Sequence, residues 1–75
     1  MEYTPRQGFF DITEKPNGLS KREHKKMQEI QMMLQKVEDE KEYHLKYDLY
    51  NWNIAKEMSV KLQRLIFKWY PNILE

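Results

Sequence analysis

The segment YHLKYDLYNWN, residues 43–53, decides whether this chain forms one long helix or a helical hairpin. Its tyrosines Tyr43, Tyr47 and Tyr50 recur at spacings of four and three residues, which is the period of one helix face. Its second half contains Asp and Asn residues, whose side chains bond to the local backbone and disfavour helix interiors. The pattern therefore predicts helix through much of the segment, with a candidate break at DLYNWN, residues 48–53.

The segment belongs to a stretch without glycine or proline that runs from Ser20 to Tyr70. The helix is predicted to begin at Ser20, because a serine followed three residues later by Glu23 forms a capping box. Pro71 ends the helical part, since the residue before a proline is disfavoured in helical geometry. One helix over the whole stretch would be roughly 77 Å long at about 1.5 Å per residue. It must therefore bend back or lie along a partner.

A second candidate break is EDEKE, residues 38–42, where the apolar stripe Met27, Ile30, Leu34 and Val37 stops. Glu and Lys are good helix formers, so this break is weak by propensity alone. We expect an all-α fold, a helical hairpin whose corner lies within 38–53, with Asn53 as a candidate cap of its second helix. A long helix in a coiled-coil-like oligomer is the alternative.

Residues 1–18 differ in composition from the rest, because they contain both glycines and two of the three prolines. PNG, residues 16–18, is a turn signal. Between these residues GFFDIT has no strand to pair with, so we interpret 1–18 as an extended N-terminal arm, flexible or docked through Phe9 and Phe10. The helical domain then covers 19–70, and 71–75 form a C-terminal tail.

Composition limits what the chain can be. Its 75 residues make one domain at most, and the chain lacks cysteine, so neither disulfides nor thiolate metal sites support a thin core. Net charge is +1, but its sign alternates along the chain, from −1 over 1–18 to +3 over 19–37, −3 over 38–50 and +2 over 51–75. Such alternation suits antiparallel or head-to-tail self-association. No apolar run is long enough for a signal peptide or a membrane span, and we expect a cytoplasmic protein.

Catalysis finds little support in the sequence. His24 lies among cations in KREHKK and is expected on a solvated helix surface. His44 lies one turn after Glu40 and is expected in a weak ion pair or at the edge of the core. Neither a phosphate-binding glycine loop nor a helical His pair is present. We therefore expect no enzyme, no catalytic residue, no metal, no cofactor and no small-molecule substrate.

The second half of the chain is apolar on two sides of the expected helix. One face collects Tyr43, Tyr47, Tyr50, Ile54, Met58, Leu62, Leu65 and Trp69, and the other collects Leu45, Leu49, Trp52, Val60 and Phe67. One short hairpin partner cannot cover both faces, and Tyr and Trp are enriched at interfaces. The sequence thus predicts a non-enzymatic protein–protein interaction module, an adaptor, an inhibitor or a homo-oligomer. Its expected contact residues are Tyr47, Tyr50, Trp52, Leu62, Phe67 and Trp69, with Phe9 and Phe10 of the arm. The alternative is that both faces belong to one intramolecular core.

Two other functions remain open. Basic rows on both helices favour a small nucleic-acid-binding or transcription-control protein, although the acidic middle and low net charge are untypical of one. Its phosphate contacts would be Lys21, Arg22, Lys25, Lys26, Lys61, Arg64 and Lys68. The chain could also be a structural subunit whose arm threads into a neighbour, and its composition would suit a small accessory protein of a phage or mobile element.

Overall fold

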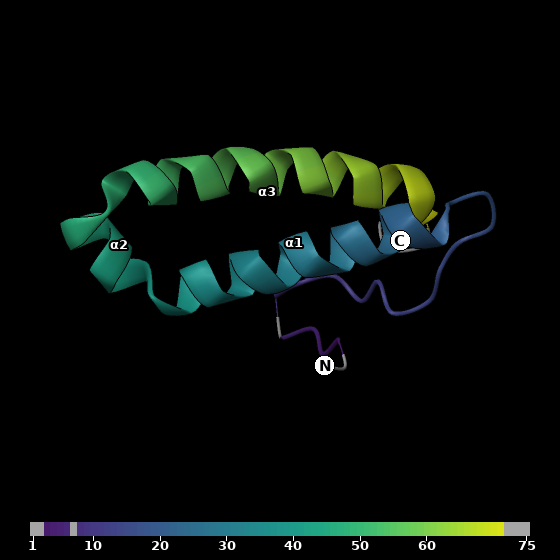
Figure 1. The fold of residues 1–75 in the computed structure, drawn as a ribbon, viewed down its shortest axis with the longest axis horizontal. Coiled ribbons are helices and arrows are strands. Elements are labelled where there is room, and N and C mark those ends of the chain that lie inside the picture. Colours follow the sequence, from purple (N-terminus) through teal and green to yellow (C-terminus); the bar gives the residue numbers. More distant parts are fainter. Residues whose placement is uncertain (1–2, 7, 72–75) are drawn as a thin grey trace.

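A computed structural model describes residues 3–6 and 8–71, and this part of the chain forms three helices and no strand. They are α1 (Lys21–Asp39), α2 (Lys41–Tyr47) and α3 (Leu49–Trp69). Helices α1 and α3 lie side by side and run in opposite directions, and α2 joins them at one end (Figure 1). The all-α prediction is confirmed. Of the predicted tail, all but Pro71 lies outside the described residues.

The start of α1 follows the predicted capping signal. The Ser20 hydroxyl accepts a hydrogen bond from the Glu23 backbone N–H at 3.1 Å, and extended geometry at Ser20 starts the first turn. The preceding turn uses Gly18 with φ of +93°, a conformation that L-residues avoid. A Cβ added there would lie 3.4 Å from the Trp69 ring, so this turn sits against the end of α3.

Both candidate breaks between residues 38 and 53 interrupt the helix. Glu40 leaves helical geometry after α1, while its N–H still bonds to the Lys36 and Val37 carbonyls. Asp48 separates α2 from α3, and its carboxylate accepts bonds from the backbone N–H and side-chain amide of Asn51 at 3.4 and 2.6 Å. The cap of α3 is therefore Asp48. The expectation for Asn53 was wrong, because Asn53 lies inside α3.

The core lies between α1, α3 and the arm. Its buried apolar members are Ile12, Leu19, Met27, Leu34, Ala55, Leu62 and Ile66. Helix α3 buries a single stripe, namely Trp52, Ala55, Leu62 and Ile66. This stripe runs between the two apolar faces that the sequence suggested, so those faces are its flanks. Ala55 and Ile66, which the face assignment left out, complete the stripe.

Candidate protein-binding surface

The N-terminal arm is docked on the chain's own helices. The Phe10 carbonyl accepts hydrogen bonds from Gln31 Nε2 at 2.6 Å and from the Tyr3 hydroxyl at 3.0 Å. The Phe10 ring packs edge-on against Phe67 of α3, with centroids 5.5 Å apart. Burial, aided by the nearby Asp11 charge, raises the pKa of Tyr3 to about 12. The arm thereby covers one side of the α1–α3 pair.

One backbone carbonyl of the arm accepts hydrogen bonds from two polar side chains of α1. The Ile12 carbonyl accepts from His24 Nε2 at 2.7 Å and from Gln28 Nε2 at 3.0 Å. A carbonyl can only accept, so Nε2 of His24 carries a proton. The Tyr70 hydroxyl donates to the Glu14 carbonyl at 2.6 Å. His24 is thus half-buried beneath the arm, which corrects the expectation of a solvated surface histidine.

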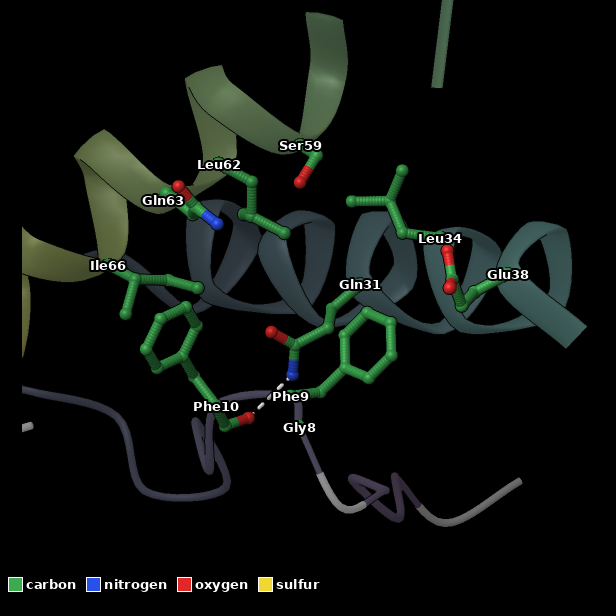
Figure 2. Close-up of a pocket in the computed structure, with 10 residues that line it drawn as sticks. All are labelled: Gly8, Phe9, Phe10, Gln31, Leu34, Glu38, Ser59, Leu62, Gln63 and Ile66. Atoms are coloured by element: carbon green, nitrogen blue, oxygen red, sulfur yellow. Dashed lines mark hydrogen bonds between the residues drawn. The ribbon is translucent and has the colours of Figure 1, made fainter. Parts of the chain in front are cut away.

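A hollow of about 340 Å³ lies beside Phe9 and Phe10, between the arm and both long helices (Figure 2). Leu34, Leu62 and Ile66 supply its apolar wall. Its polar groups are the side chains of Gln31, Glu38, Ser59 and Gln63. The Gln31 amide is already bonded to the Phe10 carbonyl in this view, so it serves to hold the arm.

The clearest candidate surface is the end of the hairpin where α2 lies. Five large apolar side chains are exposed there, and we call them the aromatic tip: Tyr43 (55% exposed), Leu45 (46%), Tyr47 (68%), Leu49 (54%) and Tyr50 (75%). None of the residues of α2 is buried. The rings of Tyr43 and Tyr47 are 5.4 Å apart, and Lys46 Nζ lies 5.4 Å from the Tyr47 ring centroid. The tip is therefore an exposed, largely apolar end of the molecule in which Tyr47 contacts Tyr43 and Lys46.

A second apolar surface lies along the other side of the α1–α3 pair. This open groove, with a volume of about 240 Å³, has an apolar floor of Met27, Ile30, Met58, Leu62 and Leu65 and a rim of Glu23, Lys26 and Lys61. It shares only Leu62 with the lining of the arm-side hollow. On α3 the groove uses Met58 and Leu65, whereas the hollow uses Ser59 and Ile66, one helical position further round. The groove and the arm thus lie on opposite sides of Leu62.

The two predicted basic rows meet at one end of the molecule. Since α1 and α3 run in opposite directions, the first turns of α1 lie beside the last turns of α3 (Figure 1). Lys26 and Lys61, one from each row, line the rim of the same groove. Within the described residues the one ion pair joins Arg6 to Asp39, so none of the seven basic side chains is held in a salt bridge there.

The predicted contact residues fall into three groups. Tyr47 and Tyr50 are exposed on the tip. Phe9, Phe10, Phe67 and Trp69 are partly covered by contacts within the chain. Trp52 and Leu62 are 7% and 4% exposed, so the chain's own core already covers them. Leu45 and Leu49 of the tip are not among the predicted contact residues, although the sequence placed both on the second apolar face.

Comparisons with models of protein families, with characterised proteins and with solved structures gave no match. Over residues 3–6 and 8–71, no helix is both long and apolar enough to cross a membrane. The same residues contain no group of three or more potential metal ligands.

Proposed function

We propose that this chain is a non-enzymatic protein-binding module that docks on its target through the aromatic tip. The observation that carries the proposal is the exposure of all five tip side chains, between 46% and 75%. Scattered apolar side chains are normal on a protein surface, but five large exposed ones within residues 43–50, at one end of the molecule, are more than such scatter and favour an interaction site. Tyrosine is also among the residues that contribute most to binding energy.

The charges around the tip indicate the chemistry of the partner. Residues 38–50 hold five carboxylates and two lysines, a net charge of −3. A complementary target would present an apolar recess bordered by Lys or Arg, because opposite charges at an interface rim speed association and exclude wrong partners. Such a module would act as an adaptor or an inhibitor of its target.

The test begins with a photoreactive residue in place of Tyr50, used to cross-link and identify the target in the native host. Purified target is then titrated with the parent chain and with Tyr50→Ala, with Val60→Ala as the matched control. Val60 is 50% exposed on α3 outside the tip. We expect at least a tenfold weaker affinity for Tyr50→Ala and less than a twofold change for the control. Equal affinities, or a target that cross-links as strongly from position 60, would refute the proposal.

The meeting of two basic rows at one end favours nucleic-acid binding as a second candidate function. Phosphate contacts by these side chains would make affinity fall with salt, with a slope near 0.9 per neutralised phosphate on a log–log scale for duplex DNA. Titration of labelled duplex DNA and single-stranded RNA at low and moderate salt tests this. The absence of binding to both at low salt would remove the candidate.

A further inference from the structure

Along its arm side, α1 carries four polar side chains, which we call the polar row: His24, Gln28, Gln31 and Gln35. They recur at spacings of four, three and four residues, so they lie on one face of the helix. The first two donate to the Ile12 carbonyl, and the third donates to the Phe10 carbonyl. These two carbonyls are two residues apart, which is the repeat of an extended chain. The polar row therefore binds the backbone of an extended segment through every second carbonyl.

The last member of the polar row has no such bond. Gln35 is only 5% exposed, and its Nε2 is buried without a hydrogen-bond partner among the described residues. Buried amides normally have a partner, because an unpaired one lowers stability. From Gln31 to Gln35 the helix advances about 6 Å, while two extended residues span ~6.6 Å. A straight segment would therefore bring the carbonyl two residues before Phe10, at position 8, to Gln35.

The arm does not supply this carbonyl, because it turns before it reaches Gln35. The Phe9 backbone N–H donates to the Arg6 carbonyl at 3.0 Å, and Gly8 has φ of +95°, which is not an extended conformation. The arm also leaves the hollow of about 340 Å³ beside Phe9 and Phe10 unfilled (Figure 2). The site thus offers one free donor and an unfilled volume to a segment that runs straight at this point. The arm of a second copy has the same sequence and would fit no better.

The outer part of the arm is held by contacts that a competing segment can replace. Both of its phenylalanines are only half-buried. Arg6 forms a salt bridge to α1 in which the two side chains are 55% and 46% exposed, and exposed pairs contribute little to stability. Thr4 and Arg6 also line the hollow that Gln35 borders. Lifting this part of the arm would therefore uncover the Gln35 amide.

We propose that the polar row and the hollow beside it form a binding site for an extended peptide segment of a partner protein, which replaces the outer part of the arm. The segment places alternate carbonyls on Gln31 and Gln35 and large apolar side chains against Leu34 and Ile66. Main-chain bonds of this kind give affinity, and the side chains in the hollow give specificity. The arm is tethered and competes at an effective concentration in the millimolar range, so the added bond and the filled hollow must offset this advantage. The inference goes beyond the proposed function, since it concerns the arm side and leaves the aromatic tip free.

The first test titrates the full chain with two acetylated peptides of residues 8–14, one with the native glycine and one with Gly8→Val. Valine avoids positive φ and favours extended backbone, so the second peptide is straight where it faces Gln35. Nuclear magnetic resonance should show saturable binding of the Gly8→Val peptide, at least fivefold tighter than that of the native peptide. Trypsin should also cut the chain after Arg6 faster as this peptide binds, because the outer arm is lifted.

The second test removes the free donor with Gln35→Met, which keeps a side chain of similar length. We expect it to weaken binding of the Gly8→Val peptide at least fivefold and to leave the unfolding midpoint of the free chain no lower than that of the parent. The control is Val60→Met, at an exposed position of α3 away from the arm, and it should change the affinity less than twofold. No saturable binding, equal affinities for the two peptides, or equal effects of the two variants would overturn the proposal. A clearly less stable Gln35→Met chain would also overturn it, since the amide would then already have a partner within the chain.

Discussion

Replacing Ile12 with alanine gives the sharpest test of how the arm supports the helices. Ile12 comes from the arm, yet its side chain is 0% exposed and packs in the same core cluster as Leu34 and Ile66. Its carbonyl also accepts hydrogen bonds from His24 and Gln28 of α1. The substitution keeps that carbonyl and removes only buried carbon, so the result measures apolar docking of the arm.

The expected loss follows from the buried atoms. Ile→Ala removes three carbon atoms, which at about 0.8 kcal/mol each gives ~2.4 kcal/mol for lost burial alone. The cavity left behind adds to this, so we expect a loss of about 2.5–4 kcal/mol in the free energy of unfolding. A domain of 75 residues has a total unfolding free energy of roughly 4–11 kcal/mol. The variant should therefore lose a large share of its stability.

Urea denaturation followed by far-ultraviolet circular dichroism measures the loss, and limited proteolysis reports whether the arm is protected. Glu14→Ala is the matched control, because Glu14 is an exposed arm residue whose contact with Tyr70 uses its backbone carbonyl. The control should lie within about 0.5 kcal/mol of the parent chain. A loss below ~1 kcal/mol for the Ile12 variant, with unchanged denaturant dependence, would refute the intramolecular docking of the arm.

Three further outcomes are expected. Ser20→Ala removes the acceptor of the Glu23 N–H and should cost about 1 kcal/mol, seen as a lower thermal midpoint. Asp48→Ala removes both bonds from Asn51 and should cost about 0.5–2 kcal/mol, with faster hydrogen exchange at the start of α3 as the diagnostic sign. For Tyr3, the pKa in the folded state is about 12, above the ordinary value of 10.0. The Tyr3 side chain therefore contributes fully to the free energy of unfolding below pH 10, and this contribution is lost as the pH rises towards 12. Denaturant midpoints across this range should fall with rising pH, and less so in Tyr3→Phe; a flat profile for the parent would contradict the assignment.

Local signals in the sequence predicted local structure well. The Ser20 cap of α1 needs only residues within one turn, so its geometry could be predicted before any packing was known. The two candidate breaks were harder to rank, because each rests on propensities of tenths of a kcal/mol. The structure uses both, one at Glu40 and one at Asp48.

Packing between distant segments could not be predicted in the same way. Gln31 is only 1% exposed, although a polar side chain at that position gave no reason to expect burial. Its hydrogen bond to the Phe10 carbonyl of the arm explains why it is buried. Its position four residues after Met27 and three before Leu34 was the one available signal, since it lies on the same helix face. The sequence also did not show that the two basic rows meet. Their relative position along the hairpin depends on the residue at which the chain reverses direction. The prediction of which side chains in the second half are buried failed for a related reason. Contacts with the arm and with α1 determine which side of α3 is covered.

The connection between α1 and α3 contains more chain than a turn requires. Two antiparallel helices can be joined by two to five residues, whereas nine residues, 40–48, lie between Asp39 and Leu49 here. Most of them form α2, a seven-residue helix that buries no side chain and is too short to be stable by itself. Fold stability therefore gives little reason for α2 or for its exposed Tyr43, Leu45 and Tyr47. The proposed binding role does give one, because a short helix at the end of the hairpin presents exposed apolar side chains away from the arm and the groove.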